Sequence, residues 1–299
     1  MASPKTSDYL QLHFLVLIWS FTAILGLLIS ISSLPLVMYR TGLAALGLGV
    51  LLVVRGINVR VRRAEALQIM GVGMLVGLHW LLFFGAARLS NASACLAGMS
   101  TTSLWTSFLE PLFTRKKVQL LDVLLSLVVI AGLYLIFLFE FNYIVGVLTA
   151  VASAFLAALF STLNSQLSHR HEALAITFYE MIGACTVSVL VVVGYLLWVD
   201  SSLPLLPQGY DWLWITTLAW GCTVFPWSIS IKLLRRFSAF AMNLIINLEP
   251  VYGIVLAFLF FGEKERMTPG FYGGTLLILV AVLSYPWLHA RLNRKELLP

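Results

Sequence analysis

The sequence predicts an all-α integral membrane protein whose ten transmembrane helices form two inverted five-helix repeats. Three observations lead to this fold class. Of the 299 residues, 60% are hydrophobic and only 11% are charged, whereas soluble domains contain about 25% charged residues. Apolar stretches of roughly 20 residues, the length that crosses a bilayer as a helix, follow one another with short polar breaks. The second five stretches echo the first five, and an odd number of crossings per copy inverts one copy relative to the other.

Each apolar stretch is predicted to be a helix, because lipid offers no hydrogen-bond partners and a helix satisfies its own backbone groups. The alternating apolar and polar pattern of a membrane barrel does not occur in the sequence. We expect a cytoplasmic lead at 1–11, a first repeat at 12–138, a second repeat at 143–288 and a cytoplasmic tail at 289–299. The predicted spans are residues 12–31, 34–54, 64–87, 91–113, 119–138, 143–167, 173–198, 210–232, 238–262 and 268–288.

The distribution of positive charge predicts the orientation of these spans. With a cytoplasmic N-terminus, fifteen of the 19 lysines and arginines fall in cytoplasmic segments, among them the cluster Arg115–Lys117. Only Arg88, Lys264 and Arg266 fall in outside loops. Cytoplasmic loops of membrane proteins carry an excess of Lys and Arg. We therefore expect a multi-pass protein of the cell (inner) membrane with both termini in the cytoplasm. The net charge of +6 therefore needs no nucleic-acid partner.

Matching residues support the internal repeat. Tyr39 in the second span corresponds to Tyr179 in the seventh at an offset of 140 residues. Beyond the longer loop of the second copy, which contains Pro204, Pro207 and Gly209, the offset becomes 147 residues. At this second offset the corresponding pairs are Trp80 and Trp227, Arg88 and Arg235, Ala94 and Ala241, and Lys117 and Lys264.

The ninth span carries the most specific local pattern. It contains Ser238-Ala239, then Leu248-Glu249-Pro250-Val251, and it ends in Phe261-Gly262-Glu263-Lys264. This pattern and the ten-span layout resemble the drug/metabolite transporter superfamily, in particular its EamA-type members. In the first copy Ser103 stands where that family often has a proline, and Arg115-Lys116 replaces the Gly-Glu. The resemblance covers the whole chain and implies a membrane transporter built from two inverted halves.

Ionisable side chains inside apolar spans are the first candidates for function. Each costs about 2.5–3.5 kcal/mol at the centre of a membrane helix on insertion scales, so such residues usually face a cavity or a partner. Arg40, His79, Glu180 and Glu249 are of this kind. We assign proton coupling to His79, Glu180 and Glu249, with structural hydrogen bonding as the alternative for each. Arg40 and Glu180 occupy corresponding positions, so they either form an ion pair or bind the charged groups of a substrate separately.

Polar and aromatic side chains complete the predicted substrate site. The polar candidates can line a cavity or form hydrogen bonds between helices, and the aromatic candidates can wall a site for a flat solute or pack between helices. The full set of predicted substrate-binding residues is Trp19, Tyr39, Arg40, His79, Trp80, Phe83, Ser100, Ser103, Asn164, Tyr179, Trp227, Asn243 and Asn247.

Two Gly-x-x-x-Gly pairs, Gly73 with Gly77 and Gly270 with Gly274, permit close helix crossing. They can act within one bundle or join two protomers, so the chain is expected to be a monomer or a homodimer. The cysteines Cys95, Cys185 and Cys222 fall inside spans without metal-ligand spacing, and no metal or cofactor is expected.

These features favour a secondary transporter. The chain lacks the Gly-rich phosphate loop and the catalytic motifs of common soluble enzymes, so we expect no enzyme activity and no ATP-driven pumping. The predicted function is transport of a small metabolite, with amino acids, including aromatic ones, as the favoured cargo, outward across the cytoplasmic membrane by alternating access. Its partners are a small-molecule substrate and the lipid bilayer. The alternatives are uptake of a nucleobase, sugar conjugate or quaternary amine on the same fold, a channel, or a membrane-embedded enzyme.

Overall fold

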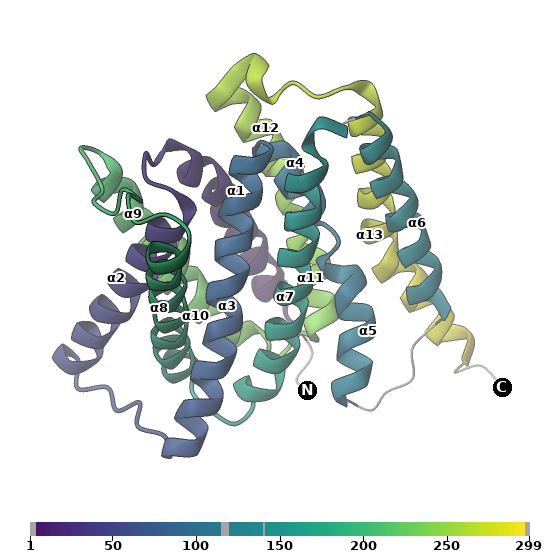
Figure 1. Cartoon of the computed structure of the whole chain (residues 1–299). Helices are drawn as coiled ribbons and strands as arrows, with labels where there is room; N and C mark the ends of the chain where they lie inside the picture. Colours follow the sequence, from purple (N-terminus) through teal and green to yellow (C-terminus); the bar gives the residue numbers. More distant parts are fainter. Residues whose placement is uncertain (1–3, 115–119, 140, 297–299) are drawn as a thin grey trace.

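A computed structural model describes residues 4–114, 120–139 and 141–296, and within these residues every regular element is a helix (Figure 1). The predicted cytoplasmic cluster Arg115–Lys117, the first three residues of the lead and the last three of the tail lie outside the described residues. The structure therefore agrees with the predicted all-helical class. The number of membrane crossings and the inverted repeat stay predictions.

Six stretches of the described chain are long and apolar enough to cross a membrane, which identifies a multi-pass membrane protein. Their length follows directly from the uninterrupted apolar sequence. They are α1 (Thr6–Leu28), α2 (Ser33–Val54), α3 (Arg63–Leu89), α7 (Ile144–Ser168), α8 (Ala173–Trp198) and the stretch Ala239–Glu265.

Three predicted spans are interrupted. The span at 91–113 is divided into α4 (Ala92–Met99) and α5 (Thr102–Thr114). The span at 210–232 contains α9 (Asp211–Ala219), a π-helical turn η2 (Trp220–Val224) and α10 (Phe225–Leu233). The span at 238–262 is divided into α11 (Ala239–Ile246) and α12 (Glu249–Phe261), and a 3₁₀ turn η3 (Gly262–Glu265) follows. The remaining elements are α6 (Leu120–Phe139), the 3₁₀ turn η1 (Phe141–Tyr143) and α13 (Pro269–Glu296).

Glycines allow the closest helix crossings inside the chain. A side chain at Gly73 would collide with the backbone of Glu180, and one at Gly77 would collide with Ala184, so both glycines seat α3 against α8. A side chain at Gly274 would collide with the backbone of Gly132, so this glycine seats α13 against α6, and the two helices stand side by side at one edge of the bundle (Figure 1). Both Gly-x-x-x-Gly pairs are thus used for packing within one chain.

Two arginines fasten the helix ends in a matching way. Arg88, at the end of α3, donates hydrogen bonds to the backbone oxygens of Gly26, Ile29 and Ile31 at 3.0, 2.9 and 2.6 Å, where α1 ends and the loop to α2 begins. Arg235, which follows α10, donates to the backbone oxygens of Ser168 and His171 at 2.7 and 2.9 Å, where α7 ends and the loop to α8 begins. These are the two arginines that the sequence comparison pairs.

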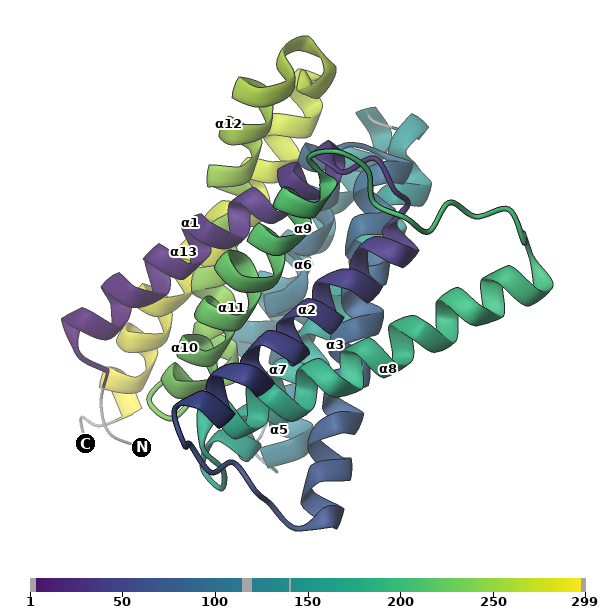
Figure 2. The same ribbon diagram turned by 90° about the vertical axis from the view of Figure 1, so that its left-hand side faces the viewer.

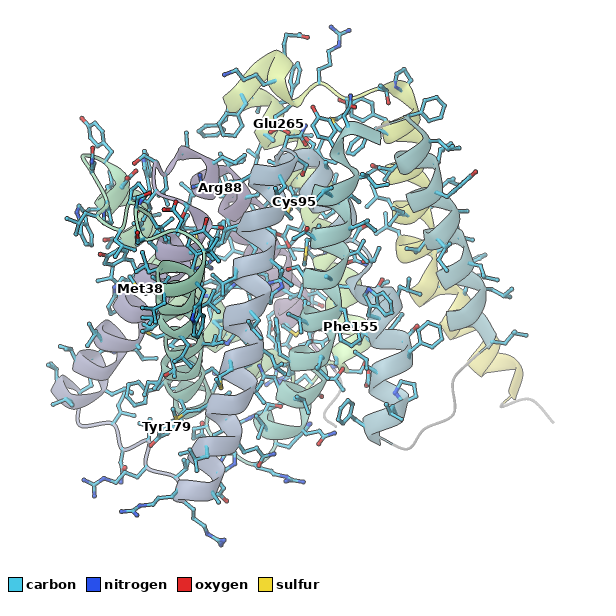
Figure 3. All side chains as sticks on the ribbon, viewed as in Figure 1. Met38, Arg88, Cys95, Phe155, Tyr179 and Glu265 are labelled. Atoms are coloured by element: carbon cyan, nitrogen blue, oxygen red, sulfur yellow. The ribbon has the colours of Figure 1, made fainter. Side chains whose placement is uncertain are left out.

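The start of α1 and the end of α13 lie at the same end of the bundle (Figures 1 and 2). Figure 3 places Arg88 and Glu265 toward the other end, and Tyr179 toward the end where the chain begins. The main core fills the space between α1, α2, α3 and α8, and a smaller one lies between α4, α6, α11 and α13. Beside the main core the helices surround a cavity, and several side chains of this core line it.

Candidate functional site

A cavity of about 100 Å³ lies inside the bundle, bounded by side chains from α1, α2, α3, α7, α10 and α11, and from the ends of α4, α5 and α12 next to the breaks. The walls come from both halves of the chain. The predicted site residues that line it are Trp19, Arg40, His79, Trp80, Phe83, Asn164, Trp227, Asn243 and Glu249. Tyr39, Ser100, Ser103, Tyr179, Glu180 and Asn247 are not among the lining residues.

Aromatic rings form much of the wall, and Trp227 is at their centre. Its ring centroid lies 5.4 Å from that of Trp80, 5.3 Å from that of Phe160 and 6.4 Å from that of Trp19. Offset and edge-on contacts at such distances are favourable between aromatic rings. The cavity therefore presents flat apolar surfaces contributed by α1, α3, α7 and α10.

Arg40 is buried in this wall, and none of the described residues forms an ion pair with it. Its side chain is 1% exposed, and its guanidinium carbon lies 4.1 Å above the ring of Trp80. Nε donates a hydrogen bond to Thr223 Oγ1 at 2.8 Å, whereas Nη1 has no hydrogen-bond partner in the described chain. The ion pairs found among the described residues do not include Arg40. The ion pair of Arg40 with Glu180, one of the alternatives from the sequence, is therefore not formed.

Glu180 is fully buried and lies behind the aromatic wall. Its Oε2 accepts a hydrogen bond from Trp227 Nε1 at 2.7 Å, and the Asn164 side chain lies close to the carboxyl group. Its Oε1 meets no donor with hydrogen-bond geometry in the described chain. Arg40 stacks on Trp80 and Glu180 is bonded to Trp227, so the two indole rings, which touch each other, separate the two charged groups.

Glu249 is the first residue of α12 and lines the cavity. Its backbone oxygen accepts a hydrogen bond from Ser20 Oγ at 3.2 Å, which ties the start of α12 to α1. Within the described residues no hydrogen bond or ion pair is formed by its carboxyl group. Pro250 follows it in the first turn of the helix, the position where a missing N–H costs nothing. The interruption of the ninth span thus presents a carboxyl group to the cavity.

His79 is bound to α7. Its Nδ1 lies 3.0 Å from the backbone oxygen of Ser153, and Ser153 Oγ donates to the backbone oxygen of His79 at 2.9 Å. Nδ1 also lies 2.8 Å from Ser153 Oγ, so a protonated Nδ1 donates to the Ser153 carbonyl oxygen and an unprotonated Nδ1 accepts from the hydroxyl group. The ring also packs edge-on against Phe160 at 5.4 Å. His79 consequently combines a structural hydrogen bond with a place on the cavity wall.

The polar candidates divide into cavity and packing groups. Asn247 donates to Ser103 Oγ at 2.6 Å, and Asn243 donates to Thr106 Oγ1 at 2.8 Å. Asn243 thus pairs with residue 106 and Asn247 with residue 103, so the two chain segments run antiparallel where α11 packs against α5. Ser100 donates to the backbone oxygen of Ala97 in its own helix at 2.6 Å. These bonds give Ser100, Ser103 and Asn247 structural partners outside the cavity.

The two tyrosines lie elsewhere. Tyr39 packs edge-on against Trp212 at 5.3 Å, and Tyr179 contacts the ring of Phe178 at 5.4 Å.

Sequence reasoning missed Thr223, which orients Arg40, and Phe160, which lies against Trp227. A threonine or phenylalanine in an apolar span carries no signal of its own. Pro226, three residues after Thr223, was the available indication that the helix is irregular at this point. No group of three or more His, Cys, Asp or Glu side chains in the described chain could hold a metal ion.

Comparisons with known proteins agree with this architecture. A family model described as the EamA-like transporter family matches residues 8–138 and 144–297. A solved structure, described only as "Crystal structure of protein", is similar over 93% of this chain and 96% of its own chain, with a TM-score of 0.67 and 16% sequence identity. At this identity the likeness supports the fold alone. No curated protein matches the sequence.

Proposed function

Because the chain belongs to the EamA-like transporter family, we propose that it is a secondary active transporter that carries amino acids, including aromatic ones, out across the cytoplasmic membrane. One observation carries this proposal. A buried arginine without a carboxylate partner and a glutamate without a described partner line the same aromatic cavity.

The charges of the cavity suit a zwitterion. Burying a guanidinium away from water is costly unless a charged or polar group compensates it, and a guanidinium binds a carboxylate through two parallel hydrogen bonds. Arg40 is thus the anchor for the carboxylate of the cargo, and Glu249 is the group that faces its ammonium. The rings of Trp19, Trp80, Phe160 and Trp227 supply the apolar surface against which an aromatic side chain packs.

The transport cycle that we propose is alternating access by two inverted halves with ten crossings. Three features support it. Arg88 and Arg235 make corresponding contacts in the two halves, α5 and α11 run antiparallel, and the chain begins and ends at one end of the bundle. Interrupted helices at a central site are typical of such carriers. Both termini are assigned to the cytoplasm, and the carrier works as a monomer or a homodimer.

Glu249 is the first choice for the coupling proton. Its carboxyl group lines the cavity, so it can exchange protons with whichever side the cavity opens to. His79 lines the same cavity but is held by Ser153, and Glu180 lies behind Trp227. These two residues are the alternatives in that order.

The cargo is tested by counterflow in reconstituted vesicles loaded with a mixed pool of amino acids, nucleobases, sugar conjugates and quaternary amines. We expect amino acids, with aromatic ones among them, to drive saturable exchange with trans-stimulation. Exchange of another class alone would replace the proposed cargo. Flux that does not saturate would indicate a channel.

The coupling assignment is tested with Glu249→Gln, which keeps the shape of the side chain and removes its titration. We expect transport driven by a pH gradient to be lost, while counterflow continues at a higher cargo concentration because a neutral amide binds the ammonium of the cargo more weakly. Glu263→Gln is the matched control, because Glu263 is exposed and paired with Arg266 at 3.2 Å. Unchanged dependence on the pH gradient in Glu249→Gln would contradict the assignment.

A further inference from the structure

The π-helical turn between α9 and α10 lies directly behind the cavity wall. A π turn contains one residue more than an α turn, so the residues that follow are rotated by roughly 100° relative to an uninterrupted α-helix. Pro226 comes two residues after the turn ends at Val224. Its nitrogen has no hydrogen to donate to the carbonyl oxygen of Cys222, four residues earlier. The sequence thus explains why the regular helix is interrupted here.

The backbone group released by the proline is used by a cavity residue. The carbonyl oxygen of Cys222 accepts a hydrogen bond from Trp19 Nε1 at 3.2 Å. In the same turn the Thr223 hydroxyl donates to the backbone oxygen of Leu218 at 2.6 Å, five residues earlier. With its hydrogen directed to Leu218, the hydroxyl oxygen is free to accept from Arg40 Nε at 2.8 Å. One turn therefore holds Trp19 of α1 and Arg40 of α2.

This contact leaves Arg40 in a defined orientation. The guanidinium plane lies against Trp80 at 4.1 Å and near Phe84 at 5.4 Å, and the bond from Nε to Thr223 fixes its rotation within the stack. The single hydrogen on Nε is donated to Thr223, which leaves the two terminal nitrogens as the further donors of the guanidinium. Of these, Nη1 has no hydrogen-bond partner in the described chain. A guanidinium held in this way is ready to bind a planar anionic group without further ordering.

We propose that Thr223 and Pro226 are positioning residues, and that the π-helical turn sets the selectivity of the carrier for solutes with a carboxylate. This inference rests on the proposed function, in which Arg40 binds the carboxylate of the cargo. Without the Thr223 hydroxyl, the guanidinium loses the bond that fixes its plane, and the two-bond geometry that a carboxylate requires is populated less often. Binding of a neutral analogue depends less on that geometry.

The test uses a pair of probes that differ only at the carboxylate, L-phenylalanine and L-phenylalaninamide. Each unlabelled probe competes with labelled L-phenylalanine for counterflow in vesicles. We expect Thr223→Val to lower the preference for phenylalanine over the amide about tenfold, the loss of one directed charged hydrogen bond. Thr223→Ser retains the hydroxyl and is expected to bring the preference back toward that of the natural chain. The control is Thr217→Val, because Thr217 is exposed on α9 and its hydroxyl donates to the backbone oxygen of Leu213, in its own helix, at 2.9 Å.

The outcomes separate this inference from the proposed function. If the natural carrier prefers phenylalanine and Thr223→Val leaves that preference unchanged or weakens both probes equally, the positioning role is wrong and the proposed function stands. If the natural carrier shows no preference, the carboxylate site is wrong and this inference falls with it. Pro226→Ala, which restores a backbone donor, gives a second test when Thr223→Val does not fold. It is expected to reduce the same preference, and an unchanged preference contradicts the role of Pro226.

Discussion

Two tryptophans give the buried charges of this protein neutral partners. Trp80 offers its ring face to Arg40, and Trp227 donates its N–H to Glu180 at 2.7 Å. A cation above an indole ring and a carboxyl group bonded to an indole N–H are both favourable arrangements. Arg40 and Glu180 do not form an ion pair with each other, and Nη1 of Arg40 has no hydrogen-bond partner in the described chain. Each half of the chain supplies one charged residue and one tryptophan.

The bond from Trp227 to Glu180 predicts a loss of stability in Trp227→Phe. Phenylalanine has no N–H, so Oε2 of the buried Glu180 would lose its 2.7 Å hydrogen bond, which costs about 1–3 kcal/mol for a buried group. We expect a lower midpoint of thermal unfolding in detergent. Trp80→Phe is the matched variant, since it keeps a ring face beneath Arg40 and is expected to cost less. Equal losses in the two variants would show that ring volume, not the hydrogen bond, matters.

Among single residues, the sequence best predicted those cavity residues whose side chains are ionisable, because burying such a side chain in a membrane costs free energy. Arg40, His79 and Glu249 could be selected because an ionisable side chain in an apolar span needs a reason, and the structure brings all three to one cavity. Ser103 and Asn247 could not be separated from cavity residues in advance. Both roles, lining a cavity and bonding to a neighbouring helix, require the same polar groups, and only the three-dimensional contact decides between them.

The half-helices α4 and α11 each begin at a glutamate from the other half of the chain. Glu265 accepts hydrogen bonds from the backbone N–H groups of Ala92 and Ser93 at 3.1 and 3.0 Å. Glu110 accepts one from the N–H of Phe240 at 2.7 Å. The first N–H groups of a helix have no partner within it, and a negative charge there is favourable. Each glutamate therefore caps the N-terminus of a helix that belongs to the other half of the chain.

The cap at α4 predicts that Glu265→Gln destabilises the protein. A glutamine offers one acceptor oxygen instead of two and no charge, so one N–H of α4 loses its partner. The expected cost is about 1–2 kcal/mol, in the range measured for helix caps, and it is read from thermal unfolding in detergent. Glu263→Gln changes the same charge two residues away on an exposed side chain and is expected to change stability by less than about 0.5 kcal/mol. An equal effect of the two variants would show that the cap has no role.

Helices were predictable from the sequence more easily than their interruptions. An apolar run fixes the existence of a span, and α2, α3, α7 and α8 lie close to the predicted ranges. The breaks at Ser100–Thr101 and Asn247–Leu248 lie inside predicted spans, where side-chain hydroxyls take up backbone oxygens. Ser100 and Thr101 donate to Ala97 and Gly98 of α4, and Ser20 of α1 donates to the backbone oxygen of Glu249. Pro250 was the visible indication of the second break. The first break has no proline at the break itself and could not be located.

Two links between the halves close the bundle at its opposite ends. At the end where the chain begins, Asp8 of α1 accepts hydrogen bonds from Arg236 Nη1 at 2.7 Å on both oxygens. At the other end, Asp211 of α9 accepts from the backbone N–H of Ser30 at 2.8 Å and from its hydroxyl. A carrier that opens to one side at a time must break the links on that side and keep those on the other. In the proposed transport cycle, these two aspartates are therefore opposing constraints on the equilibrium between the two states.

The opposing links predict opposite effects of two matched substitutions. Asp8→Asn removes the charge that holds Arg236, so the state open toward the chain termini gains population, whereas Asp211→Asn favours the state open toward the far side. Accessibility is measured as maleimide labelling of Ser230→Cys, a cavity position, in a background whose native cysteines are replaced by alanine. We expect Asp8→Asn to raise labelling only from the side of the termini and Asp211→Asn only from the other. Because each variant removes one negative charge, a general loosening of the bundle would raise labelling from both sides, and that outcome would contradict a two-state carrier.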